Sequence, residues 1–262
     1  MQHLTITLIQ TQLVWEDIDA NLERFDAAIE AIEAPTDLIV LPEMFSTGFS
    51  MNAPALAEKM DGRAVTWLRR KAARKNAVFT GSLMVQDAGR YYNRLVWARP
   101  DGSLLTYDKR HLFRYAGEEK VYTAGDKLLT VELKGWRIRP FICYDLRFPV
   151  WIRNLGPAYD LALFVANWPS RRAAHWRALL RTRAIENQAY VAAVNRVGKD
   201  GKGFDHSGHS ALIDPAGEVL FEKENQACTQ TLRLEYQTLK DYREKFPAWM
   251  DADLELVDSS IR

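Results

Sequence analysis

A short apolar run that breaks at a cysteine constrains this chain more than any other feature. Residues 136–142 read WRIRPFI, the length of a buried strand, and Cys143 ends the run before the polar pair Tyr144-Asp145. A cysteine where a strand becomes a turn directs its sulfur out of the sheet, and ligands of open α/β sheets bind outside the carboxyl ends of strands. Cys143 is therefore a candidate nucleophile. The alternative is a small buried hydrophobic residue, as most free cysteines are.

The length and composition fit one globular domain. The chain has 262 residues, of which 47% are hydrophobic and 26% are charged. We therefore predict a single domain over residues 1–262. The formal net charge is +1, so nothing indicates a nucleic acid or an anionic membrane as a partner.

The cysteine count and the first segment predict a cytoplasmic location. Two cysteines, Cys143 and Cys228, cannot form a disulfide framework, which fits a reducing compartment. Residues 1–17, MQHLTITLIQTQLVWED, lack the basic segment and the small-residue cleavage site of a secretory signal. No apolar run approaches membrane-spanning length, so we expect a soluble cytoplasmic protein.

Strand and helix patterns mix along the whole chain. Strands are expected at residues 4–9, 37–41, 78–85, 91–99, 104–108, 128–133, 136–142, 160–166, 190–195, 209–213, 218–223 and 230–234. Helices are expected at residues 21–32, 65–75, 172–187 and 235–245. Residues 110–126 and 198–208 lack periodicity and are expected to be loops, and the length of the first indicates function. Hairpins as well as crossovers favour an α/β fold with one mixed sheet, or with two sheets between helical layers.

Three chemically active side chains stand at the ends of predicted strands: Glu43, Lys109 and Cys143. A free thiol is only a few per cent thiolate at neutral pH, so it needs a base to take its proton. A carboxylate such as Glu43 can do this, and a cation such as Lys109 can stabilise the thiolate and the developing oxyanion. Taken singly, Glu43 could be an exposed loop acid and Lys109 a surface cation, and the strand pattern does not show that the three meet.

Three segments resemble the signatures of the nitrilase superfamily of carbon–nitrogen hydrolases. They are PEMFSTGF at residues 42–49, YDKRHLF at 107–113 and ICYDLRFP at 142–149, in family order. The resemblance continues through ANWP at 166–169, RAIENQAYV at 183–191 and YREKFPAW at 242–249. It implies a four-layer α-β-β-α sandwich, a homodimer formed through helices, and no cofactor.

The resemblance also implies the chemistry. By similarity, Glu43 is the general base, Lys109 the stabilising cation and Cys143 the nucleophile of an amide hydrolysis that passes through a thioester. A second glutamate often joins such a triad from the loop after the lysine. Glu118 and Glu119 both qualify, and the spacing of Glu118 to the following residues resembles that of related amidohydrolases more closely.

A backbone group and two aromatic residues complete the expected centre. The N–H of Tyr144 follows the nucleophile at the turn, so we expect it to be the second oxyanion donor. Phe45 and Phe113 follow Glu43 and Lys109 closely and are candidates either for lining the substrate pocket or for the core.

Within the superfamily, EMFSTGFSM, CYDLRFP and ANWP are most similar to the omega-amidases, which deamidate 2-oxoglutaramate or succinamate. The carboxylate of such a linear amide requires a cation or several N–H donors. Arg114, Arg147 and Arg171 are candidates, although Arg147 is also suited to a structural salt bridge, which we favour for it. Trp168 suits pocket lining and core equally. The alternatives are a carbamoyl-amide hydrolase or a nitrilase with the same triad, and a catalytically idle binding subunit.

Several other residues invite functional interpretations that we do not favour. His111, His206 and His209 lack metal-ligand spacing, so we predict no metal site. Cys228 lies in a polar stretch and is interpreted as a bystander thiol. The five arginines within residues 171–183 are expected to be paired at the surface or in a subunit interface rather than to bind phosphate.

Overall fold

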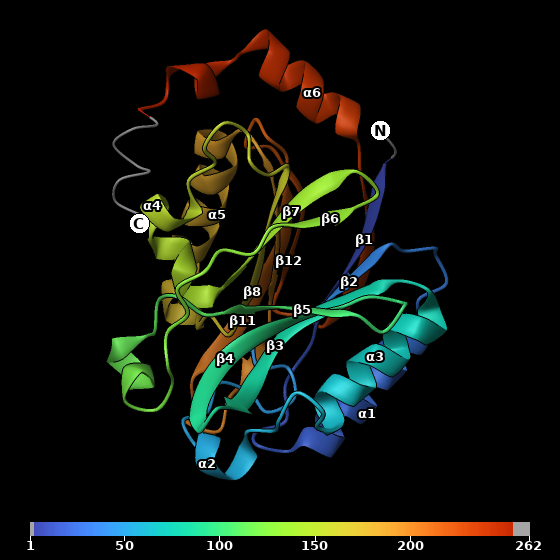
Figure 1. Cartoon of the computed structure of the whole chain (residues 1–262), viewed down its shortest axis with the longest axis vertical. Coiled ribbons are helices and arrows are strands. Elements are labelled where there is room, and N and C mark those ends of the chain that lie inside the picture. The colour runs from blue at the N-terminus through green and yellow to red at the C-terminus, as the bar shows by residue number, and fades with distance from the viewer. Residues whose placement is uncertain (1–2, 254–262) are drawn as a thin grey trace.

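Two β-sheets packed face to face form the centre of the computed structural model, which describes residues 3–253 (Figure 1). The first sheet contains β1 (Leu4–Gln10), β2 (Leu38–Val40), β3 (Val78–Asp87), β4 (Arg90–Ala98), β5 (Leu104–Asp108) and β13 (Cys228–Leu234). The second contains β6 (Val131–Leu133), β7 (Trp136–Ile142), β8 (Leu161–Ala166), β9 (Tyr190–Asn195), β10 (Val197–Lys199), β11 (Asp205–Ile213) and β12 (Val219–Glu224). Their orders are β13-β1-β2-β3-β4-β5 and β10-β11-β9-β8-β7-β6, with β12 paired to β11.

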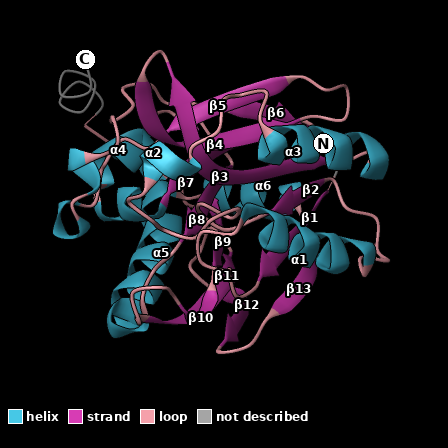
Figure 2. Ribbon diagram, turned by 90° about the horizontal axis from the view of Figure 1, so that it is seen from below, coloured by secondary structure: helices cyan, strands magenta, loops and turns pink. Residues whose placement is uncertain are grey.

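Helices cover the outer faces of both sheets (Figures 1 and 2). The α-helices are α1 (Ile18–Glu30), α2 (Ala53–Leu56), α3 (Arg63–Lys75), α4 (Pro149–Ile152), α5 (Ala173–Asn187) and α6 (Tyr236–Lys245). The 3₁₀ turns are η1 (Arg114–Ala116), η2 (Glu118–Lys120), η3 (Cys143–Arg147), η4 (Ser170–Arg172) and η5 (Ala248–Asp251). Helices α1 and α3 lie on the six-stranded sheet and α5 lies on the seven-stranded one. The expected α-β-β-α arrangement is confirmed.

Strand β2 shows why the apolar runs form buried strands. Leu38 and Val40 belong to the core between the sheets, whereas Ile39 and Leu41 pack into the core under α1 and α3. A strand covered on both faces has no solvent side, so its sequence is continuously apolar rather than alternating.

The strand directions bring the predicted reactive residues to one edge. Strands β7, β8 and β9 are parallel to one another. In the other sheet β2 is parallel to β3, and two antiparallel pairings then return β5 to the direction of β2. The carboxyl ends of β2 and β5 therefore lie at the same edge of their sheet, as do those of β7 and β8 in theirs.

The prediction that residues 198–208 form a loop is wrong at both ends. Strand β10 pairs with β11 in an antiparallel hairpin, and only the residues between them form a turn. The Asp200 carboxylate closes that turn by accepting hydrogen bonds from the N–H groups of Lys202 and Phe204, both at 2.9 Å. Glycines and charged residues conceal such a short ladder in the sequence.

Smaller differences concern short elements. Strand β6 begins at Val131, so residues 128–130 are not part of it, and α2 and α4 were not predicted because a single turn leaves no periodicity. The expected loop at 110–126 contains η1 and η2. Within residues 3–253, no helix is long and apolar enough to cross a membrane. The ends of the predicted domain, residues 1–2 and 254–262, lie outside the described residues.

Candidate active site

Glu43, Lys109 and Cys143 meet between the two sheets. Glu43 follows β2 and Lys109 follows β5 in the six-stranded sheet, while Cys143 follows β7 in the other. The Lys109 Nζ lies 2.8 Å from Glu43 Oε1, and both side chains are fully buried. The charges of Glu43 and Lys109 both act on the Cys143 thiol, and Cys143 and Lys109 line the same cavity. The three side chains predicted from separate strand ends thus share one site.

The backbone turns sharply at the nucleophile. Cys143 has a φ of 45°, in the left-handed region that non-glycine residues seldom occupy. Such strain persists where the surrounding structure enforces it, often at functional sites. Cys143 also begins η3, so the N–H of Tyr144 lies in the first turn, where helical N–H groups have no partner within the helix. An N–H group in this position can donate to an anion.

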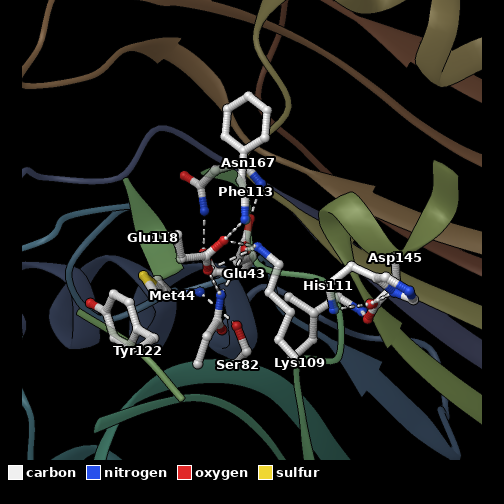
Figure 3. Close-up of polar contacts among 12 residues, drawn as sticks. Glu43, Met44, Ser82, Lys109, His111, Phe113, Glu118, Tyr122, Asp145 and Asn167 are labelled. Carbon is white, nitrogen blue, oxygen red and sulfur yellow. Dashed lines mark hydrogen bonds and ion pairs between the residues drawn. The ribbon is translucent and has the colours of Figure 1, made fainter. Parts of the chain in front are cut away.

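Glu43 is held by donors from both sheets (Figure 3). Its Oε1 accepts from Asn93 Nδ2 at 2.8 Å as well as from Lys109, and its Oε2 accepts from the backbone N–H of Asn167 at 2.8 Å. The Asn167 side-chain amide also donates to the backbone carbonyl of Glu43. Three donors from two sheets therefore fix the orientation of this carboxylate.

Glu118, rather than Glu119, contacts the cluster. Its carboxylate is fully buried and accepts two hydrogen bonds from Lys109 Nζ, at 2.9 and 3.0 Å. It also accepts from the Phe113 N–H at 2.6 Å and from Asn93 at 3.2 Å. Figure 3 shows Lys109 reaching both Glu118 and Glu43. The lysine is therefore bracketed by two carboxylates.

Burial and the neighbouring charges act in opposite directions on these groups. Burial favours neutral Lys109, but the Glu118 and Glu43 carboxylates outweigh it and raise the lysine pKa, so the ammonium is retained. Burial also raises the pKa of Glu118, against the attraction of Lys109. For Cys143, burial and then the Glu43 charge raise the thiol pKa well above its ordinary value, although Lys109 opposes them. The resting nucleophile is therefore a thiol.

A cavity of about 260 Å³ opens onto the thiol. Its aromatic lining includes Phe49, Phe113, Tyr144, Trp168 and Phe204. Its cations, apart from Lys109, are Arg147, Arg171, Arg172 and Lys202. The size suits a small molecule with one charged end.

The predicted binding residues divide into two groups. Phe113, Trp168 and Arg171 line the cavity, and Trp168 also donates its indole N–H to the Arg172 carbonyl at 2.7 Å. Phe45 and Arg114 do not line it: of the two alternatives for Phe45 the core is the one observed, whereas the prediction that Arg114 binds in the cavity is wrong. Phe45 is fully buried among aromatic residues under α1 and α3, and Arg114 lies exposed on η1.

Two interpretations of arginines also change. Arg147 does not form the expected salt bridge: its guanidinium lies 4.8 Å from the centre of the Trp168 ring, inside the cavity. Of the helix arginines, Arg177 and Arg183 do pair with carboxylates, at 2.7 and 2.8 Å. Arg172 instead lies over the Phe113 ring at 5.1 Å. Helical periodicity does not distinguish a cavity arginine from a paired one.

Two asparagines were missed. Asn167 follows β8, the strand next to β7, so its position at a strand end was a usable signal. Asn93 lies within β4 and offered none. Within residues 3–253, no three His, Cys, Asp or Glu side chains are grouped to hold a metal ion.

The whole chain resembles known proteins. The family model described as carbon-nitrogen hydrolase matches residues 5–243. An omega-amidase, YafV of Escherichia coli K12, is 51% identical, with 97% of this chain and 98% of that protein covered. A 2-oxoglutaramate amidase of Bacillus subtilis is 36% identical, covering 94% and 96%. A CN-hydrolase superfamily protein of Xanthomonas campestris, solved with an arsenic adduct in its active site, superposes with a TM-score of 0.94 at 47% identity, covering 97% and 98%.

The raised pKa of Cys143 has a spectroscopic consequence. Because burial penalises the charged form, thiolate absorbance near 240 nm should develop only above pH 9, the ordinary thiol value. The measurement is a pH titration of the wild-type protein minus that of Cys143→Ala, in which Cys228 cancels. A difference spectrum already complete at neutral pH would mean that the resting nucleophile is a thiolate.

Proposed function

The chain belongs to the carbon–nitrogen hydrolase family, and on that premise we propose that it is an omega-amidase. It releases ammonia from a short dicarboxylate monoamide such as 2-oxoglutaramate or succinamate. The names of the relatives in Escherichia coli and Bacillus subtilis support this activity. The cavity supports it independently.

The carrying observation is a thiol in the lining of a cavity whose cations, apart from Lys109, have no acidic partners within residues 3–253. Arg147, Arg171, Arg172 and Lys202 form no salt bridge with any carboxylate in residues 3–253. The one acid of the lining is Asp200, and one of its carboxylate oxygens accepts two hydrogen bonds from the backbone of its own turn. An excess of unpaired positive charge favours an anionic substrate. A nitrile or an uncharged amide would leave that charge unused.

Arg172 is our choice for the substrate carboxylate. It is partly buried, and burial followed by the like charge of Arg171 lowers its pKa, so an arriving carboxylate relieves an unfavourable environment. Arg171 is more exposed and lies against the rings of Tyr115 and Phe204, at 5.4 and 4.7 Å. Phe113, beneath Arg172, holds the guanidinium plane in place.

The proposed reaction has two halves. Cys143 Sγ attacks the amide carbon while Glu43 takes the thiol proton, and the oxyanion is stabilised by Lys109 Nζ and the Tyr144 N–H. The C–N bond then breaks, and the nitrogen leaves as ammonia with the proton from Glu43. Water, deprotonated by Glu43, attacks the thioester, releasing the carboxylic acid and restoring the thiol. Glu118 keeps Lys109 charged and directed at the site.

Assembly, domain count and location are part of the proposal. We propose one catalytic domain and a homodimer formed through α5 and the adjoining β12, where Ile185, Val219 and Leu220 are 46%, 47% and 52% exposed. Exposed apolar side chains on neighbouring elements are typical of an interface. Sedimentation equilibrium tests whether the protein is a dimer.

We also propose a cytoplasmic location, because two unpaired cysteines fit a reducing compartment.

The substrate class is tested by ammonia release from a panel. We expect turnover of 2-oxoglutaramate and succinamate to exceed that of N-carbamoyl-β-alanine and of an aryl nitrile, because only the first two combine a short amide with a carboxylate at the matching end. Preferred turnover of the carbamoyl compound or the nitrile would identify one of the alternative enzymes. An inactive wild type would favour an idle binding subunit.

The two cysteines provide a second test by the same measurement of ammonia release. Cys143→Ala should abolish activity, and Cys228→Ala should leave it nearly unchanged.

Lys109→Met separates charge from packing. An oxyanion stabiliser acts mainly in the transition state, so kcat should fall by about a hundred- to a thousandfold with KM little changed. The variant also leaves two buried carboxylates without their cation, so its folding must be verified by circular dichroism. Lys71→Met is the matched control, since Lys71 is a buried lysine of α3 that pairs with Asp26 of α1 at 2.7 Å. A raised KM with kcat intact would indicate instead that Lys109 binds the substrate carboxylate.

Arg172→Met tests the carboxylate subsite. Loss of a charged hydrogen bond should raise KM for succinamate about 10- to 100-fold. The rate with butyramide, which lacks the carboxylate, should not fall. Arg177→Met, which removes an arginine paired with Glu222 on the surface, controls for the loss of a positive charge. An unchanged KM for succinamate in Arg172→Met would transfer the role to Arg147 or Arg171.

A further inference from the structure

Asp145 is a buried carboxylate that the proposed reaction does not use. It lies two residues after Cys143 and is fully buried. A buried carboxylate is costly unless hydrogen bonds satisfy its oxygens. Asp145 accepts from Tyr107 Oη at 2.7 Å, the His111 ring Nδ1 at 2.8 Å, the His111 backbone N–H at 2.9 Å and the Ile142 N–H at 3.0 Å.

The positions of these donors are the informative feature. Tyr107 and His111 stand two residues before and two residues after Lys109, and Ile142 directly precedes Cys143. Tyr107 belongs to β5 of the six-stranded sheet, and Ile142 belongs to β7 of the other. One carboxylate therefore binds the chain on both sides of the lysine and beside the cysteine, joining two sheets at their carboxyl edge.

Packing restricts the movement of this cluster. The His111 ring stacks on Phe148 with centroids 3.7 Å apart and planes 6° from parallel. Trp151 donates its indole N–H to Tyr107 Oη at 3.0 Å. Phe148 and Trp151 both come from the segment that follows the nucleophile turn. Figure 3 shows the His111–Asp145 pair beside the Lys109 cluster but separate from it.

We propose that Asp145 is a positioning residue, which sets the placement of the Lys109 ammonium relative to the Cys143 sulfur by fixing the backbone on either side of each. The proposal rests on the catalytic roles proposed for Lys109 and Cys143. Within residues 3–253, the hydrogen bonds of the Asp145 carboxylate join it to neither the Lys109 ammonium nor the Cys143 thiol.

Geometry explains why such a residue would matter. An oxyanion donor acts at about 2.7–3.1 Å, and a misplacement of about 1 Å can cost about a hundredfold in rate. Lys109 and Cys143 come from different sheets, so a small shift between the sheets changes their separation directly. An aspartate is suited to this position because it only accepts hydrogen bonds, and all four groups that face it donate.

Asp145→Asn is the principal test. The amide retains the shape of the carboxylate but directs an NH₂ group at donors, so one of its two polar atoms no longer accepts hydrogen bonds from the groups around Asp145. We expect kcat for succinamate to fall about 10- to 100-fold while KM stays within about threefold, because the arginines of the cavity are untouched. The thiolate titration of Cys143 should also move to higher pH, because a displaced Lys109 no longer favours the charged sulfur.

Asp160→Asn is the matched control. Asp160 is also fully buried and accepts from the Arg137 N–H at 3.0 Å and from Arg243 at 2.8 Å, but it precedes β8 at the opposite edge of the sheet. Its variant should lower Tm without changing kcat per folded molecule or the thiolate titration.

Two outcomes would overturn the proposal. The first is a wild-type kcat in folded Asp145→Asn. The second is a fall in kcat that Asp145→Asn and Asp160→Asn share and that the decrease in Tm of each variant accounts for. If Asp145→Asn does not fold, Tyr107→Phe replaces it as the test, because it removes one donor to Asp145. Its kcat should fall about fivefold with KM retained. An unchanged kcat in Tyr107→Phe would also overturn the proposal. Failure of the amidase proposal is distinguishable, because the wild type would then release no ammonia whereas the thiolate titration would still report the placement of Lys109.

Discussion

The burial of the Lys109 ammonium between the carboxylates of Glu43 and Glu118 is the interaction on which the site depends. All three side chains are fully buried, and Lys109 contacts both acids within 3.0 Å. An isolated charge at this depth would be very unfavourable, and loss of one member of such a cluster leaves a neighbour without compensation. Because Glu43 is also bonded to Asn167 of the other sheet, the same charges that prepare catalysis connect the two sheets.

Much of this arrangement was predictable from the sequence, for a physical reason. The run before Glu43 is apolar because β2 is buried on both faces, and the last three residues before Cys143 are buried as well, so the residue that ends each run marks a strand end at the ligand edge. Strand β5, before Lys109, lies at the edge of its sheet and is only partly buried. Local patterning therefore located the reactive residues, and resemblance was needed to bring them together. Asn93 could not be found in this way, since it lies within a strand and only the tertiary structure directs its amide at Glu43 and Glu118.

The binding residues were less predictable because their roles depend on partners that are distant in the sequence. Arg172 and Arg177 occupy the same arginine-rich segment, yet Arg177 reaches Glu222 whereas Arg172 lies over Phe113 in the cavity. The position of Phe45 after Glu43 left pocket lining and core open; it packs against Phe25 and Trp67 under the helices, and Phe49 lines the cavity instead. Proximity along the chain does not determine which face a side chain reaches when the backbone turns sharply, as it does at Met44 with a φ of 43°.

The charge balance of the buried cluster explains why a neutral thiol suits this site. A resting thiolate would place a negative charge beside the Glu43 carboxylate in a desolvated space, so burial and the Glu43 charge raise the pKa of Cys143 well above its ordinary value. In the proposed reaction, the thiol proton passes to Glu43 as the sulfur attacks the carbonyl, and the negative charge of that carboxylate is replaced by the charge of the oxyanion. The net charge stays the same while it moves to a position that Lys109 and the Tyr144 N–H can stabilise. A site of this kind activates its nucleophile only when an electrophile is present to receive the charge.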